Sequence, residues 1–468
     1  MIRLGLISFS DGRLRVHESL APDIREHEAK IKKILEAGGE IEVVPAEDIV
    51  HSADAARREA KRLAAGDMDG VIFNIAVFAF PNFVVIAAQA CSGPILLLGP
   101  HDSRYPGLTG LLASGGALNQ VGIDHARLWI DLDDVRLPGE VLKFARPAAA
   151  AKRLRGQVYG LIGGRSIGMY TGAAPAERWQ RHFGVDVDHV DQSEIVRRAQ
   201  LMPEREVKVA KTWLEAHVAE VVIDGLQLTP EKFDFEVRCW MALKQIVAEH
   251  HFDFVGLKCH FDMSEFYSVQ CLGAAFLNDP YDWQGPKQPV PLACESDSDA
   301  ALTMQLLTLL SGKPSCLLDW RYFDPQKQLY VTPNCGSAAT WFAARSDDPA
   351  QNLKRVRIVP AIAKYAGGGA HVEFVFAAGE LTLARLTRTP DKYQMVIGRA
   401  QAVEFPISEV TGAARQWPHA FLQMDILPQE LVLKLQSNHI HAVAGDYREE
   451  LVRLCRLLDV EPVMLDDR

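Results

Sequence analysis

Two acidic residues, Glu295 and Asp319, each follow a short apolar run, at residues 290–294 and 315–318. Between the runs, residues 299–310 have a helical pattern with apolar residues on most faces. This order predicts a parallel, right-handed strand–helix–strand unit. Both carboxylates would then lie at the carboxyl edge of one sheet, where α/β proteins bind ligands. Two acids there could hold a divalent cation and carry protons, or each could be a solvated acid at a strand end.

Other polar residues also follow predicted strands. A turn after the first strand would place Arg13 at a carboxyl end, where it could reach a polar ligand or only face solvent. Lys258 ends the strand-like run 252–257. His439 and His441 stand in a predicted short loop before the last helix, where a histidine could ligate a metal or be structural. The glycine-rich segment 163–168 permits a tight turn but lacks the Lys-Ser/Thr pair of a phosphate-binding loop.

Composition limits the class of protein. A chain of 468 residues that is 48% hydrophobic and 24% charged is globular, with two or three domains. A net charge of −10 argues against a nucleic-acid partner. No apolar run reaches the ~18 residues of a membrane helix, so no membrane association is expected. The start shows no signal-peptide layout, and the eight scattered cysteines lack a C-x-x-C pair, which predicts reduced thiols and a cytoplasmic location.

The elements that must position these residues change type along the chain. Alternating strand and helix patterns predict a doubly wound α/β domain over residues 1–153 and a second α/β domain over 154–311, which carries Glu295. Residues 312–468 are β-rich and predict an antiparallel β-barrel or sandwich that carries Asp319 and His439. Long helices are predicted over 203–222 and 230–250. The first strand is not followed by the G-x-G-x-x-G motif of dinucleotide-binding proteins. The sequence therefore gives no indication of a nicotinamide or flavin cofactor.

Helix boundaries in the central segment are marked by specific residues. Ser296, Asp297 and Ser298 offer N-cap chemistry at the start of the helical pattern. Gly312 fits the C-terminus of that helix, and Pro314 opens the next run. In the first domain, the helical pattern is predicted from Pro22 to Leu35.

With these residues in place, the chain resembles the bacterial L-fucose isomerase family, which is related to the L-arabinose isomerases. The resemblance runs nearly end to end, although this chain is shorter than the L-fucose enzymes. Five stretches carry it: residues 11–13 with 18–20, residues 163–172, residues 293–298, residues 318–321 and residues 438–446.

The resemblance implies roles for individual residues. Glu295, Asp319 and His439 would bind one divalent metal, typically Mn²⁺, with Co²⁺ or Mg²⁺ as alternatives, and the two acids would also transfer protons. Trp417 and Asn438 would line the sugar site. Arg13 would reach the sugar across a subunit boundary. The chain would form a homo-oligomer, and the resemblance implies a hexamer.

The resemblance also has one departure. Where the L-fucose enzymes have a glutamine that contacts sugar, this chain has Lys258. An ammonium group suits an anionic or more oxidised sugar substituent, or it could pair with a nearby carboxylate.

The expected activity is therefore metal-dependent aldose–ketose isomerisation of a free sugar, such as L-fucose or D-arabinose, through a cis-enediol. That chemistry needs a base, an acid and charge stabilisation at two neighbouring oxygens, which two carboxylates and a metal supply. The alternatives are isomerisation of a modified, for example sulfonated, hexose, a non-catalytic sugar-binding or regulatory protein on the same scaffold, and a metal-dependent hydrolase or aldolase.

Overall fold

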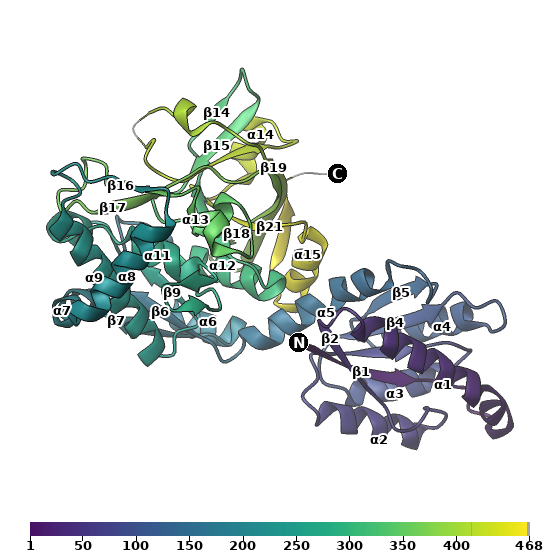
Figure 1. The fold of residues 1–468 in the computed structure, drawn as a ribbon. Helices are drawn as coiled ribbons and strands as arrows, with labels where there is room; N and C mark the ends of the chain where they lie inside the picture. Colours follow the sequence, from purple (N-terminus) through teal and green to yellow (C-terminus); the bar gives the residue numbers. More distant parts are fainter. Residues whose placement is uncertain (413, 466–468) are drawn as a thin grey trace. The chain divides into compact units, whose positions relative to one another are not determined.

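The structure is a computed structural model that describes residues 1–412 and 414–465 (Figure 1). The chain divides into two units, Met1–Lys152 and Arg153–Arg468. The first unit holds a parallel sheet with helices on both faces, and the second combines a parallel sheet with a largely antiparallel eight-stranded sheet. The predicted fold class is confirmed. Among the described residues, no helix is both long and apolar enough to cross a membrane.

The first unit has strand order β2-β1-β3-β4-β5, with every pairing parallel. Successive residues of its buried strands face opposite layers, so Val71 and Phe73 pack with α2, α3 and α4, whereas Ile72 packs with α1 and α5. The strands are β1 (Ile2–Ser8), β2 (Ile41–Pro45), β3 (Gly70–Asn74), β4 (Ile95–Pro100) and β5 (Ala126–Ile130). The helices are α1 (Leu14–Glu36), α2 (Ala53–Ala64), α3 (Pro81–Ala90), α4 (Gly107–Gln120) and α5 (Leu137–Leu154).

Helix α1 begins earlier than predicted. The sequence pattern placed its start at Pro22, because proline is common in a first turn and disrupts a helix interior. In the structure Pro22 lies inside the helix, and Arg13 occupies the N-cap position. Arg13 therefore stands between β1 and α1, at the carboxyl end of the first strand as predicted.

The parallel sheet of the second unit has strand order β12-β9-β6-β7. Its strands are β6 (Val158–Ile162), β7 (Asp186–Val190), β9 (Phe254–Leu257) and β12 (Leu292–Cys294). Its helices are α6 (Ala176–Phe183), α7 (Ser193–Leu201), α8 (Glu204–His217), α9 (Pro230–Glu249), α10 (Asp262–Phe266) and α11 (Cys271–Asn278). The helix predicted to reach residue 222 ends at His217, because the chain then pairs as β8 (Glu220–Val221) in parallel with β16 (Arg357–Pro360).

The large sheet has the order β13-β21-β18-β19-β20-β15-β14, with β22 parallel to β19 and all other pairings antiparallel. Its strands are β13 (Ser315–Asp319), β14 (Tyr322–Asp324), β15 (Leu329–Pro333), β18 (Gly379–Arg388), β19 (Tyr393–Ala402), β20 (His419–Gln423), β21 (His439–Ala444) and β22 (Glu461–Met464). The remaining elements are β10 (Tyr281–Asp282), β11 (Gly285–Pro286), α12 (Ser298–Ser311), α13 (Pro349–Leu353), β17 (Ala370–Glu373), α14 (Pro428–Lys434), α15 (Arg448–Leu457) and three 3₁₀ turns.

The central strand–helix–strand unit differs from the prediction. Strands β12 and β13 do not share a sheet, because β12 pairs in parallel with β9 while β13 pairs antiparallel with β21. Helix α12 contacts strands of both sheets and is buried along nearly its whole length. A helix that is apolar on most faces must be covered on most faces, so it lies between two sheets rather than outside one. The predicted parallel unit was wrong, and its helix connects two sheets.

Candidate active site

Glu295, Asp319 and His439 converge although they come from different sheets. His439 Nε2 lies 3.4 Å from Asp319 Oδ1 and 3.6 Å from Glu295 Oε2. Asp319 and His439 are register partners at the ends of β13 and β21, so their side chains share one face of the sheet. His439 was predicted to lie in a loop, but it is the first residue of β21. This strand is paired on both sides, with β13 and with β18.

Glu295 occupies an unusual backbone turn between β12 and α12. Glu295 and Ser296 have φ values of 61° and 55°, in the left-handed region that non-glycine residues rarely adopt. The Ser296 backbone N–H donates to the Leu257 carbonyl at 3.0 Å, which ties the turn to β9. Such residues destabilise a fold by about 1–3 kcal/mol each and persist only where the surrounding structure holds them. The turn carries the Glu295 carboxylate to the imidazole of His439.

Asp297 holds the opposite edge of the same imidazole. Its Oδ2 is 2.7 Å from His439 Nδ1, and its carboxylate also pairs with the buried Arg385 guanidinium. Of the three candidate N-cap residues of α12, the structure uses Asp297, since its Oδ1 accepts the Ala300 N–H at 3.0 Å. The sequence pattern indicated only this capping role. The Glu-x-Asp spacing after a strand was the available signal that a second acid stands near the site.

The electrostatics of the cluster follow from burial and charge. Burial would lower the pKa of His439, but hydrogen bonds to Asp297 and Asp319 outweigh it and raise that pKa to about 10. Burial raises the pKa of Glu295; the charge of His439 opposes this, and that of Asp319 adds to it. The pKa of Asp297 lies well below its ordinary value, because Arg385 and His439 overcome its burial. Glu295 is thus the carboxyl that burial favours in its protonated form.

His260 is a further member of the cluster to which sequence reasoning gave no role. Its Nε2 lies 3.6 Å from Glu295 Oε1, and its ring stacks on Tyr365 with centroids 5.0 Å apart. Burial, aided by Lys364, lowers the pKa of His260 to about 4, so its imidazole is neutral at physiological pH. Its place two residues after Lys258, at the end of β9, was the only sequence signal.

Trp417 and Asn438, the two predicted sugar-site residues, differ in their surroundings. Trp417 is buried, its Nε1 has no hydrogen-bond partner among the described residues, and Lys364 Nζ lies 5.4 Å from its ring centroid. Asn438 directly precedes His439, its side chain is exposed, and its carbonyl accepts from the Trp320 backbone N–H at 3.0 Å. A buried N–H without a partner is suited to a ligand hydroxyl.

Lys258 lies beside Glu295 along the sheet edge but is paired with another acid. Leu257 and Cys294 are register partners, so Lys258 and Glu295 end neighbouring strands. The Lys258 ammonium donates to Asp262 Oδ2 at 2.6 Å. It lines a cavity of about 550 Å³ with residues that include Gly163, Gly164, Asp191, Gln192 and Tyr267. The sequence allowed Lys258 either to bind an anionic sugar substituent or to pair with a nearby carboxylate. The structure shows the pairing with a carboxylate.

Arg13 belongs to the first unit and is held by Asp11. Its guanidinium Nε and one terminal nitrogen donate to the two oxygens of the buried Asp11 carboxylate, at 2.9 and 2.6 Å. The Arg13 side chain is 69% exposed. The hydrogen bonds with Arg13 lower the pKa of Asp11 in spite of its partial burial. The arginine is therefore oriented and accessible at the same time.

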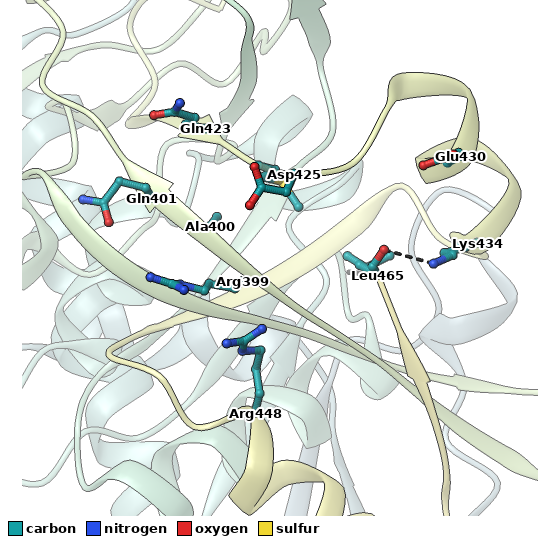
Figure 2. A pocket seen from close by; sticks show the side chains of 10 residues that line it. Arg399, Ala400, Gln401, Gln423, Asp425, Glu430, Lys434, Arg448 and Leu465 are labelled. Carbon is teal, nitrogen blue, oxygen red and sulfur yellow. Dashed lines mark hydrogen bonds between the residues drawn. The ribbon is translucent and has the colours of Figure 1, made fainter. Parts of the chain in front are cut away.

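A larger cavity, of about 880 Å³, lies elsewhere in the second unit (Figure 2). Its lining is mostly polar and charged and comes largely from β19, β20, α14 and α15. Lys434 Nζ donates to the Leu465 carbonyl at 3.0 Å across it, Arg399 pairs with Glu380, and Arg448 pairs with Asp446. None of the predicted site residues lies among those that line it. Its size therefore does not mark it as the reaction site.

The cluster can be compared with the donor set of a divalent cation. Within residues 1–412 and 414–465, no three or more His, Cys, Asp or Glu side chains form a ready cation cage. Glu295 and Asp319 nevertheless lie 3.6 and 3.4 Å from His439 Nε2. Adjacent ligands of an octahedral Mg²⁺- to Ca²⁺-sized ion lie about 2.9–3.5 Å apart. Two carboxylates and one imidazole, with the second ring nitrogen bonded to a carboxylate, match the donor types of such an ion.

Comparison with known proteins gives consistent matches. The model described as L-fucose isomerase, first N-terminal domain, matches residues 1–156, and the one described as L-fucose isomerase, C-terminal domain, matches residues 332–465. Sulfoquinovose isomerase of Priestia megaterium is 25% identical over 429 residues, which are 90% of each chain. Sulfoquinovose isomerase of Alkalicoccus urumqiensis is 23% identical over 85% of this chain and 86% of its own. L-fucose isomerase of Bacteroides thetaiotaomicron is 25% identical over 54% of this chain and 48% of its own.

Proposed function

The chain belongs to the L-fucose isomerase family, and from this premise we propose that it is a metal-dependent isomerase that interconverts an aldose and its ketose. The observation that carries the proposal is the convergence of Glu295 and Asp319 on one nitrogen of His439, from two different sheets. Packing alone does not require two acids and an imidazole to meet, because buried charges destabilise a fold unless they are paired.

Glu295, Asp319 and His439 would hold the cation, with Mn²⁺ as the first choice and Co²⁺ or Mg²⁺ as alternatives. When bound, the cation would polarise the sugar carbonyl and stabilise the negative charge that develops on the two neighbouring oxygens.

The two acids would move the protons. Interconversion takes a proton from the carbon beside the carbonyl, passes through a cis-enediol and returns a proton to the former carbonyl carbon. The former carbonyl oxygen gains a proton, and the neighbouring hydroxyl oxygen loses one. Burial raises the pKa of Glu295, which brings the carboxyl closer to the pH at which one group can both accept and return a proton. Asp319, whose side chain is 21% exposed, would serve as its partner. Trp417 and Asn438 would bind sugar hydroxyls beside them.

The sugar itself is either a simple aldose, such as L-fucose or D-arabinose, or a modified hexose that carries a sulfonate. The extent of the sequence match favours the sulfonated hexose. The relatives named sulfoquinovose isomerase match over 85–90% of this chain, and the L-fucose isomerase matches over 54%. Lys258 supports it only if the ammonium leaves Asp262 to bind the sulfonate. Arg13 would complete the site from a neighbouring subunit of a homo-oligomer, by family resemblance a hexamer.

A panel of sugars tests the proposal. The full chain, freed of metal and then supplied with Mn²⁺, is assayed for ketose formation from L-fucose, D-arabinose and sulfoquinovose. We expect turnover of at least one sugar, loss of turnover without metal and recovery when Mn²⁺ returns. Tight sugar binding without turnover on any member would instead support the non-catalytic sugar-binding alternative.

A further inference from the structure

A fully buried ion pair stands directly behind the imidazole of His439. Arg385 is 0% exposed, and its two terminal nitrogens lie 2.8 and 3.1 Å from the two oxygens of Asp297. Asp297 Oδ2 is also 2.7 Å from His439 Nδ1. These three residues come from β18, the start of α12 and β21, so the contact joins three separate elements.

The contact with Asp297 determines which nitrogen of the His439 ring faces Glu295 and Asp319. A carboxylate accepts hydrogen bonds, so the Nδ1 beside Asp297 carries the proton of that bond. Nε2, the other nitrogen, is the one that faces Glu295 and Asp319. Metal-binding histidines are commonly oriented in this way, by a carboxylate on the nitrogen that does not bind the metal.

Capping does not explain why Asp297 is charged. Its Oδ1 accepts the Ala300 N–H, a role that a neutral Asn or Ser fills equally well. A fully buried ion pair contributes little net stability compared with apolar side chains of the same volume. Both charges nevertheless lie in the core, and among the described residues the carboxylate has one further side-chain hydrogen bond, with His439. The orientation of the imidazole is therefore the role that requires a carboxylate at this position.

Asp299 provides an internal comparison. It is also in the first turn of α12, is fully buried and is paired with an arginine, since Arg388 Nε lies 3.1 Å from its Oδ2. No hydrogen bond or ion pair joins Asp299 to His439 among the contacts of the described residues. Two buried Asp–Arg pairs thus stand at the N-terminal end of α12, and one of them contacts the imidazole.

We propose that Asp297, held in place by Arg385, is the positioning residue that fixes the ring of His439 with Nε2 toward Glu295 and Asp319, and thereby sets the affinity of the site for Mn²⁺. The inference rests on the proposed function. It adds a buried Asp–Arg pair that contacts the imidazole through Nδ1, whereas Glu295 and Asp319 lie near Nε2.

The test measures Mn²⁺ binding separately from turnover. Asp297→Asn keeps the cap oxygen and the side-chain size but loses the carboxylate, and Asp299→Asn is the matched control. Metal-free full-length protein is titrated with MnCl₂ and free Mn²⁺ is followed by electron paramagnetic resonance. We expect Asp297→Asn to bind Mn²⁺ about 10–100-fold more weakly, and Asp299→Asn to stay within about twofold of the unchanged protein.

Turnover gives a second readout that a loss of folding would not imitate. At saturating Mn²⁺, Asp297→Asn should regain a large part of its kcat while the KM for the sugar changes little, because the ligands themselves are intact. Arg385→Lys, which retains the Asp297 carboxylate and cap, should weaken Mn²⁺ binding by a smaller factor, since an ammonium cannot replace the two-point contact. Thermal unfolding of each metal-free variant reports folding independently.

The outcomes separate the two hypotheses. If Asp297→Asn and Arg385→Lys both bind Mn²⁺ as tightly as the unchanged protein, or if Asp299→Asn weakens binding as much as Asp297→Asn, the positioning role is wrong. If the unchanged protein neither binds Mn²⁺ nor turns over any sugar, the proposed function itself fails. Should Asp297→Asn not fold, Arg385→Lys decides the question, because weakened Mn²⁺ binding supports the role and unchanged binding refutes it.

Discussion

Asp319 and His439 lie directly opposite each other on the antiparallel strands β13 and β21, with Oδ1 and Nε2 3.4 Å apart. This pairing exists because the chain, after leaving the parallel sheet at Glu295, passes through α12 and joins the second sheet rather than returning to the first. The proposed reaction site therefore lies where two sheets of one unit meet around a buried helix.

Removal of either acid should abolish isomerisation. Glu295→Gln and Asp319→Asn each remove a proton carrier and a proposed metal ligand, so we expect kcat to fall by about three orders of magnitude or more. Metal content is measured alongside rate, because a variant that keeps Mn²⁺ but loses turnover isolates the proton transfer. Glu409→Gln, at an exposed position of the second unit, is the control and should retain full activity. Substantial turnover by either site variant would contradict the assignment.

The route of the transferred hydrogen can be measured in deuterated water. A cis-enediol route passes the proton through a side chain, so deuterium should enter the ketose at the carbon that receives the hydrogen. A hydride shift would carry the original hydrogen across without exchange. Mass spectrometry of product formed at low conversion distinguishes the two, and product without deuterium would rule out the acid–base roles of Glu295 and Asp319.

Lys258→Gln should change which sugar is preferred. If the ammonium leaves Asp262 to bind an anionic substituent, we expect kcat/KM for sulfoquinovose to fall at least about tenfold, since a charge-assisted hydrogen bond contributes about 1.5–3 kcal/mol. The values for L-fucose and D-arabinose, and the affinity for Mn²⁺, should stay within a few fold. Asp262→Asn is the companion variant that frees the lysine. An unchanged sugar panel would show that the Lys258–Asp262 pair is structural.

The buried carboxyl of Asp299 should make the stability difference between Asp299→Asn and the unchanged protein depend on pH. Burial raises its pKa from 3.8 to about 6, although Arg388 opposes the shift. Between pH 3.8 and about 6 the folded state retains a proton on Asp299 that the unfolded state has lost. The contribution of this group to the free energy of unfolding therefore falls as pH rises through that range. Above about pH 6 both states have lost the proton, so the contribution no longer changes. Asp299→Asn should therefore gain stability relative to the unchanged protein between pH 4 and 6.5, by up to about 3 kcal/mol.

Denaturant unfolding of the metal-free proteins across that pH range provides the measurement. Asp124→Asn, at an exposed position of the first unit, serves as control and should show a constant difference from the unchanged protein. A constant difference for Asp299→Asn as well would mean that its carboxyl is ionised in both states.

Arg13 gives a test of assembly. We expect a homo-oligomer, by resemblance a hexamer, in light scattering of the full chain, and Arg13→Ala should lower kcat/KM without changing the mass. If Arg13 acts on a neighbour's site, oligomers reassembled from Arg13→Ala and Glu295→Gln chains should recover part of the activity, because some sites then combine both intact residues. A fully active monomer, or mixtures no better than their parents, would refute this arrangement.

The sequence by itself determined the local features of this protein. Short buried strands alternating with helices predicted the parallel sheets. A cap within residues 296–298 and the helix end at Gly312 were also correct, because these depend on residues close together in the chain. The three proposed metal-site residues were also identified from the sequence, through motif resemblance, before any geometry placed them together.

Only the tertiary structure decided which sheet each strand joins. The composition of β13 is that of a parallel partner of β12, yet β13 pairs with β21, more than a hundred residues later in the chain. In this arrangement α12 is covered by strands of both sheets. The same long-range packing brings Arg385 to Asp297 and His260 to Glu295. Contacts between residues so far apart in the chain leave no periodic signal, because they depend on how whole layers pack and not on local backbone preference.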